Sequence, residues 1–269
     1  KALEANGIIA KGERLYAEVH TAEAEREYLA AQKTAATLNS ALCNTLNAET
    51  TYQPISSMFI LSQIEDVDHF KQLALNNNPQ LRQGGLKKDL AVEGVRLQRA
   101  DFAPQVALMG GASFYNYQVT PLMPRWAVGA GVSFKIFDGL NREYKFSAAK
   151  SQVRQVEALN VKAQHDILTL IDKLYNEMTT YNEQLPSIDA AYNFAAEYLR
   201  IKEEAFKEGA APSSDVVDAQ LNLAKIKTER LQAAYYYDLM LARLLEACGE
   251  SEMLTEYARR PAAMPIRYE

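Results

Sequence analysis

The sequence predicts a mainly α-helical protein with one β-hairpin, organised around long antiparallel helical hairpins. Residues Asn141–Glu208 contain a single helix breaker, Pro186, and their apolar side chains recur at steps of three and four residues. A compact turn follows at Gly209–Asp215. From Trp126 to Ile136, apolar residues alternate with small or polar ones, which is the two-residue period of a strand. Together these three observations define the predicted fold class.

The composition excludes several classes of protein. With 269 residues, 48% hydrophobic and 23% charged, the chain is long enough for one or two domains and too apolar to be disordered. The net charge of -5 argues against a surface that binds nucleic acid. No apolar run reaches the about 18 residues of a transmembrane helix, and no secretory leader is predicted at Lys1. Cys43 and Cys248 are too few for a disulfide framework and are expected to be small buried residues.

Helices are expected before the strands. The first covers residues 10–46 and is followed by a linker over 48–68. Residues 69–102 are expected to be helical as well. Pro104 ends this segment and biases Ala103 toward an extended backbone.

Two strands are predicted at Val106–Tyr117 and Trp126–Phe137, within a hairpin region over 105–137. Each strand has about 12 residues, enough for the about 9–11 of a transmembrane β-strand. One face of the second strand would suit lipid, through Trp126, Val128, Val132 and Phe134. A soluble hairpin packed on one face is the alternative, and the hairpin alone favours that alternative.

The long helical hairpin is expected over residues 140–248, with a C-terminal tail over 249–269. Pro186 either kinks the first helix or divides it into two. Gly209 is a plausible C-cap, and Ser213 or Ser214 a plausible N-cap for the next helix. That helix runs to residue 247 with a near-heptad apolar seam that includes Tyr235.

An internal repeat links the first helix to the last. A shift of 202 positions places Gly7 on Gly209, and brings Glu13 against Asp215 in the same helical phase. The chain would then hold one complete repeat over 69–248 and only the last helix of an earlier repeat over 1–47. We therefore expect the chain to be truncated at its N-terminus.

Four short motifs occur in the order of a known family. They are Phe206–Gln220 around the turn, Phe102–Gln105 before the first strand, Phe137–Gly139 after the second, and Asn78–Leu81 in the preceding helical region. Together they resemble the TolC-like outer membrane efflux proteins over roughly residues 1–250. The chain departs from the family in lacking a first strand pair, and in carrying Leu140 where a second glycine is often found.

The resemblance implies both an architecture and a function. Three subunits would form a homotrimer, with four strands each closing a transmembrane β-barrel and the long helices acting as staves of a periplasmic α-barrel. The protein would be an outer membrane channel subunit of a tripartite efflux or type I secretion system, with a large periplasmic portion. It would be a passive conduit and not an enzyme, with no cofactor. Its partners would be a periplasmic adaptor (membrane fusion) protein, an inner-membrane transporter and outer membrane lipid, with no nucleic acid.

A soluble periplasmic adaptor or structural protein built on helical hairpins is the alternative function. Its two strands would form a small soluble sheet. Dependence of the protein on detergent would distinguish the two classes.

The resemblance also assigns candidate site residues. Asp215 and Asp218, three residues apart on one helical face, match the acidic residues that narrow the periplasmic entrance of the family. Phe206 matches an aromatic residue near the same constriction, whereas Ala211 stands where some members carry a basic residue. Acidic residues in a first turn also favour the helix dipole, so Asp215 and Asp218 have a simpler structural role available.

Two exposed tips are expected to contact the adaptor protein. They are formed by Gly7, Ile8 and Ile9 and by Gly209, Ala210 and Ala211. The three histidines are scattered, without metal-ligand spacing, and no residue pattern is typical of a catalytic site. No metal is therefore expected.

Overall fold

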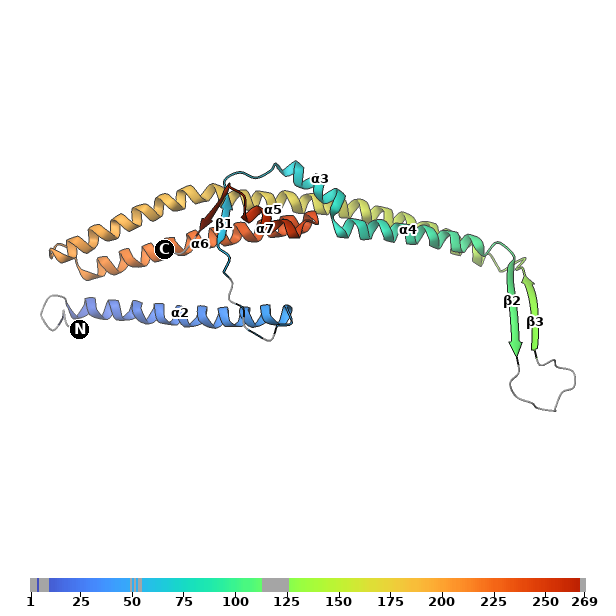
Figure 1. Cartoon of the computed structure of the whole chain (residues 1–269), viewed down its shortest axis with the longest axis horizontal. Helices are drawn as coiled ribbons and strands as arrows, with labels where there is room; N and C mark the ends of the chain where they lie inside the picture. The colour runs from blue at the N-terminus through green and yellow to red at the C-terminus, as the bar shows by residue number, and fades with distance from the viewer. Residues whose placement is uncertain are drawn as a thin grey trace, which may run out of the picture. The chain divides into compact units, whose positions relative to one another are not determined.

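The computed structural model describes residues 4, 10–48, 50, 52, 55–112 and 126–266 (Figure 1). It confirms the mainly helical fold class. The helices are α2 (Lys11–Thr45), α3 (Val67–Asn77), α4 (Pro79–Ala100), α5 (Asn141–Lys207), α6 (Ser213–Cys248) and α7 (Leu254–Ala258). The strands are β1 (Met58–Leu61), β2 (Gln105–Ala112), β3 (Trp126–Ser133) and β4 (Ala263–Ile266).

The chain forms two compact units. The first combines residues 1–67, 172–246 and 250–269, and the second combines 68–171 with 247–249. Helix α5 contributes its first half to the second unit and its second half to the first. The boundaries predicted at 47, 68 and 248 come from the internal sequence repeat, whereas the two units are defined by spatial compactness. The division into repeats therefore stays a prediction.

The core of the first unit lies between α5 and α6. These helices run antiparallel, because Asp189 pairs with Arg230 at 2.7 Å and Tyr181 stacks on Tyr236. The buried face of α6 passes through Tyr237, which is 1% exposed. Tyr235, which the sequence places on the near-heptad seam, is 52% exposed in this chain.

Helix α5 continues through Pro186 without a break. The interpretation that Pro186 divides the segment into two helices was therefore wrong. A proline in a helix interior removes one backbone hydrogen bond and clashes with the preceding turn. Burial of the neighbouring Leu185, which is 6% exposed, helps to hold this stretch against the core despite that cost.

A small two-stranded sheet joins two segments that the sequence analysis treated as linker and tail. β1 pairs antiparallel with β4, with Met58 opposite Ile266. Beyond the sheet, Arg260 binds Glu65 at 2.8 Å and stacks on the ring of Tyr257, whose hydroxyl also donates to Glu65 at 3.1 Å. This cluster holds the segment around Tyr257 and Arg260 against the segment around Glu65.

Asp238 of α6 meets the free edge of this sheet. Its Oδ2 accepts a hydrogen bond from the backbone N–H of Phe59 at 3.2 Å, while its Oδ1 is buried with no hydrogen-bond partner among the described residues. Burial disfavours the charged form and raises the pKa of Asp238 to about 7, and the hydrogen bond from Phe59 only partly opposes this. The neutral acid is the form that this environment stabilises.

The contribution of Asp238 to stability should therefore fall as pH rises toward neutrality. The native pKa of Asp238 lies above the ordinary 3.8, so between these values the native state holds a proton that the unfolded chain has released. We expect the contribution of Asp238 to the free energy of unfolding to be highest below pH 4 and to drop by about 2 kcal/mol up to pH 8, after allowance for the exposed part of the side chain. Urea unfolding from pH 4 to 8 measures this drop.

Asp238→Asn should flatten that dependence, since the amide does not titrate. Asp89→Asn, which changes an exposed carboxylate of α4, is the matched control and should leave the pH dependence in place. Equal slopes for the wild type and Asp238→Asn would show that Asp238 titrates normally.

In the second unit, Asn78 separates α3 from α4, so the predicted helical region over 69–102 is two helices. The Asn78 Oδ1 accepts hydrogen bonds from the backbone N–H groups of Gln80 at 2.8 Å and Leu81 at 3.0 Å, which caps α4. Its Nδ2 donates to the carbonyl of Ala247 at 2.7 Å. Asn78 is 4% exposed and thus forms a buried polar joint with the end of α6.

Gly249 completes this joint. It adopts a left-handed backbone, with φ of 76°, and a Cβ placed on it would lie 2.5 Å from the carbonyl oxygen of Asn77. Only glycine can bring the chain past Asn77 this closely without a shift of the backbone.

Helices α4 and α5 run antiparallel beside each other in the second unit (Figure 1). Asn160 donates to the carbonyl of Gly84 at 3.0 Å, and Lys88 pairs with Glu157 at 3.1 Å. A Cβ on Gly84 would lie 2.5 Å from the Asn160 side chain, so glycine permits the close approach.

β2 and β3 pair antiparallel, as predicted, with Ala112 opposite Trp126 and Gln105 opposite Ser133. β3 ends at Ser133, four residues before the predicted end at Phe137. The register explains the difference, because the next residue on the facing strand would be Pro104, which has no N–H to donate. The predicted extension of the first strand beyond residue 112 lies outside the described residues.

Candidate functional site at the helix tip

The turn between α5 and α6 has the glycine cap that the sequence predicts. Gly209 has φ of 76°, its N–H donates to the carbonyl of Phe206 at 3.0 Å, and the N–H of Ala210 donates to the carbonyl of Ala205 at 2.8 Å. This pair of bonds is a Schellman motif, which satisfies the last carbonyls of a helix. Gly209 and Ala210 are exposed, and Ala211 and Phe206 are half-buried.

The start of α6 is capped from another helix. The carboxylate of Glu13 in α2 accepts from the backbone N–H of Ser213 at 3.1 Å and from its hydroxyl at 2.6 Å. A carboxylate at this place also interacts favourably with the N-terminal dipole of α6. The sequence suggested serine as the capping acceptor, whereas Ser213 donates its hydroxyl hydrogen to Glu13.

Asp215 is bound across the turn. Lys202 of α5 contacts it at 2.6 Å, and this hydrogen bond raises the pKa of Lys202 above its ordinary value. The Lys202 ammonium also lies 5.4 Å from the centre of the Tyr198 ring. Lys202 was not anticipated, because its position thirteen residues before Asp215 becomes close only once the hairpin turns.

Asp218 is bound to the neighbouring helix. The Tyr16 hydroxyl of α2 donates to Asp218 Oδ1 at 2.5 Å, and this bond raises the pKa of Tyr16. Residues 13 and 16 thus contact residues 213 and 218 in the same order along the chain. The first turns of α2 and α6 therefore run parallel to each other.

Three contacts consequently converge on the first turns of α6, which we call the tip contacts: Glu13–Ser213, Tyr16–Asp218 and Lys202–Asp215. The structure brings both predicted acidic residues to the tip and pairs them with different helices. The other predicted tip residues, Gly7, Ile8 and Ile9, lie outside the described residues.

The four residues predicted to face lipid are exposed in the hairpin. Trp126, Val128 and Val132 lie in β3, and Phe134 lies one residue beyond its end. All eight residues of β2 are exposed, so neither face of that strand is covered by the described part of the chain. Contact of these residues with lipid stays a prediction.

The described residues contain no group of histidine, cysteine and acidic side chains that could hold a metal ion. None of the helices described combines the length and apolar character needed to cross a membrane. Cys248 is buried, as expected, with its Sγ 3.3 Å from the carbonyl of Phe70, whereas Cys43 is only half-buried.

The fold and the tip define a class of proteins built on long antiparallel helices. A short exposed β-hairpin connects α4 to α5, and a glycine turn connects α5 to α6. A profile of the outer membrane efflux protein family matches residues 71–250. The chain therefore belongs to this family, as the sequence motifs indicated. The family consists of transport channels and not of enzymes.

The chain is also similar to individual proteins. The chain is 23% identical over 173 residues to the outer membrane protein TolC of Vibrio cholerae, covering 63% of this chain and 39% of that protein. Its structure is similar to those of VceC from Vibrio cholerae and of the open state of MtrE from Neisseria gonorrhoeae. Both comparisons give a TM-score of 0.74, at 18% and 17% identity.

These structural matches show a shared fold. They cover 92% and 90% of this chain, but only 60% and 57% of the two solved chains. The chain thus spans little more than half the length of its structural relatives.

Proposed function

We propose that this chain is part of an outer membrane channel subunit of a tripartite efflux or secretion system. The subunit would form a homotrimer and provide a passive conduit from the periplasm to the exterior. Membership of the outer membrane efflux protein family supports the proposal. The main structural observation behind the proposal is the set of tip contacts. In these contacts two acidic residues at the start of α6 bind side chains of neighbouring helices.

The tip is proposed to be the periplasmic gate. Around a threefold axis, Asp215 and Asp218 would contribute six carboxylates to one constriction, with Phe206 close to them. Two of the tip contacts join α2 to α6, so the gate could not widen between these helices without breaking both. Because the contacts are polar and partly exposed, each is weak enough to be broken by a partner that binds the tip.

The partner at the tip is proposed to be a periplasmic adaptor protein, which would connect the channel to an inner-membrane transporter. Gly209, Ala210 and Ala211 present small side chains that allow another helical hairpin to approach closely. The residues of the second proposed tip, 7–9, are outside the described part of the chain.

The exposed hairpin supports the channel over a soluble adaptor. A soluble hairpin packed on one face would bury every second residue, but no described residue of β2 or β3 is buried. Exposed apolar side chains on both strands suit lipid on one side, as Trp126, Val128, Val132 and Phe134 would in an outer membrane β-barrel.

The gate is tested by single-channel recording of the full-length trimer. Asp215→Asn with Asp218→Asn removes both charges at nearly constant shape, and should weaken block by multivalent cations while leaving trimer assembly intact. Loss of the Lys202 ion pair and weakening of the Tyr16 bond should also make openings about two- to fivefold more frequent.

Asp189→Asn is the matched control, because it breaks the Asp189–Arg230 ion pair of the same helical hairpin away from the tip. This variant should conduct as the wild type does. If the double variant keeps the cation block and opening frequency of the wild type, the two acidic residues serve only to favour the start of α6.

A further inference from the structure

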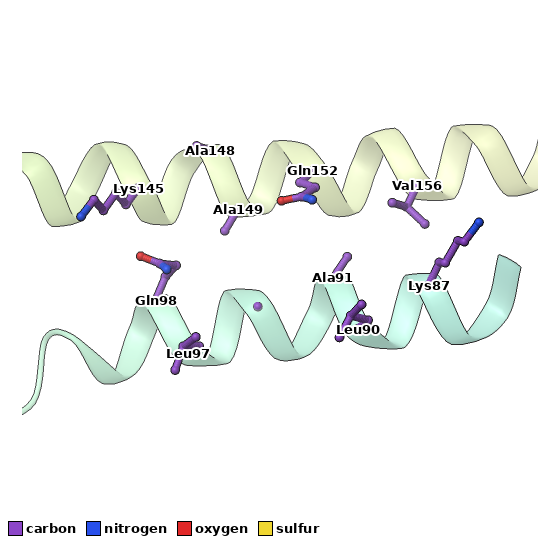
Figure 2. A pocket seen from close by; sticks show the side chains of 11 residues that line it. Lys87, Leu90, Ala91, Leu97, Gln98, Lys145, Ala148, Ala149, Gln152 and Val156 are labelled. Atoms are coloured by element: carbon purple, nitrogen blue, oxygen red, sulfur yellow. The ribbon is translucent and has the colours of Figure 1, made fainter. Parts of the chain in front are cut away.

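A long groove lies between α4 and α5 in the second unit, and none of the tip residues lines it. Figure 2 shows it between the two antiparallel helices, with Ala149 and Gln152 of α5 and Ala91 and Gln98 of α4 directed toward the space. Its volume is about 770 Å³, which is within the range of about 300–1,000 Å³ found for small-molecule sites. Along α4 it extends from Lys87 to Gln98, about 16 Å at 1.5 Å per residue.

The groove owes its width to small residues. Small residues of both helices line it, namely Ala91 and Gly94 of α4 and Ala148 and Ala149 of α5, so little side-chain volume fills the space here. A Cβ added to Gly94 would meet no atom within 4 Å, which shows that this part of the groove is open space. The surface it offers is therefore apolar and elongated.

The ends of the groove are cationic. Lys87 lies at one end and Lys145 near the other (Figure 2), and neither forms an ion pair with a described residue. None of the lining side chains is acidic, although the whole chain carries 34 acidic residues against 29 basic ones. A groove with this charge pattern complements a negative group at either end.

We propose that this groove binds an anionic amphiphile, namely a free single-chain fatty carboxylate. The alkyl chain would lie along the row of small residues, and its carboxylate would be bound by Lys87 or Lys145. The elongated shape, about 16 Å along α4, and the single lysine near each end suit one alkyl chain with one charged end. This site goes beyond the proposed channel function, and its test does not depend on channel activity.

The test measures binding of dodecanoate to the purified chain by calorimetry, at concentrations below micelle formation. Gly94→Leu fills the groove and should abolish its binding of dodecanoate. Gly85→Leu is the matched control, because Gly85 also lies in α4 and also has no atom within 4 Å of an added Cβ, but does not line the groove. Both variants replace a helical glycine by a good helix former, so neither should lose helix stability.

The charge is tested separately. Lys87→Gln with Lys145→Gln should weaken dodecanoate binding about fivefold, the effect of losing exposed ion pairs, and should leave binding of uncharged dodecyl maltoside unchanged. Adsorption to the exposed strands would respond to none of these variants and would overturn the proposal. Equal weakening by Gly94→Leu and Gly85→Leu would overturn it as well.

Two other occupants are separated by the same variants. If the groove instead holds a helix from a second copy of the chain, Gly94→Leu will change the sedimentation coefficient while dodecanoate binding stays as in the wild type. If it holds membrane phospholipid, vesicles of anionic phospholipid will displace dodecanoate from the wild type. Either result would contradict a free fatty carboxylate as the ligand.

Discussion

Gly249→Ala is expected to lower the free energy of unfolding by about 3 kcal/mol. The left-handed backbone at φ of 76° costs a side-chain-bearing residue about 1–2 kcal/mol. The added Cβ would also lie 2.5 Å from the oxygen and 2.9 Å from the carbon of the Asn77 carbonyl, and relieving such a contact typically costs about 1–3 kcal/mol. The Asn77 backbone cannot move away easily, because the next residue is the buried Asn78.

Gly209→Ala separates the two causes. Gly209 has the same φ of 76°, but a Cβ there would meet nothing within 4 Å. Gly209→Ala should therefore lower the free energy of unfolding only by the cost of the left-handed backbone, about 1–2 kcal/mol. Urea denaturation of both variants measures the difference, and equal losses would mean that Gly249 does not approach Asn77 as closely as described.

Asn78→Ala should also destabilise strongly, by about 2–4 kcal/mol. Alanine removes the cap of α4, which is typically worth about 1 kcal/mol. It also leaves the carbonyl of Ala247 without the bond from Asn78 Nδ2, and an unsatisfied buried acceptor costs about 1–3 kcal/mol. The two losses fall on different elements, so they should add approximately.

Asn78→Ser provides the control, since serine caps a helix about as well as asparagine does but has no amide to donate to Ala247. Circular dichroism during urea denaturation should place its stability between the wild type and Asn78→Ala at neutral pH. A stability equal to the wild type would show that the bond to Ala247 contributes nothing.

The helices and the hairpin could be predicted from sequence because their evidence is local. The stretch with Pro186 as its single breaker forms α5, the glycine turn forms a Schellman motif at Gly209, and the alternation from Trp126 forms β3. Even the boundary between α3 and α4 was marked, since Asn78 precedes Pro79 and the two residues form a cap followed by the first helical position.

The features that were missed depend on residues far apart in the chain. β1 and β4 are four residues each, too short to show a period, and they pair across more than 200 positions. Three consecutive tyrosines, 235–237, are equally apolar in sequence, so only packing decides that Tyr237 is the buried one. The partners of the acidic tip residues, Tyr16 and Lys202, likewise lie on other helices.

The departure from the family at Leu140 has a structural meaning. Leu140 follows Gly139, and both adopt left-handed backbone conformations, with φ of 67° and 71°. A glycine at position 140 would adopt this conformation without the cost of about 1 kcal/mol that a side chain brings. The turn geometry therefore explains why glycine would be favoured there, but nothing in the structure explains the choice of leucine.

The contact between Tyr16 and Asp218 has a consequence for the history of the chain. These positions coincide under the 202-residue shift, so two identical copies of one helix would place the same side chain on both sides of the contact. Two aspartates would repel each other at this distance, and two tyrosines would lack the carboxylate acceptor. If the chain arose by tandem duplication, the residues at positions 16 and 218 had to become different from each other. Only then could the two helices pack side by side in this register. Glu13 and Asp215, also 202 positions apart, both remained acidic and instead acquired different partners.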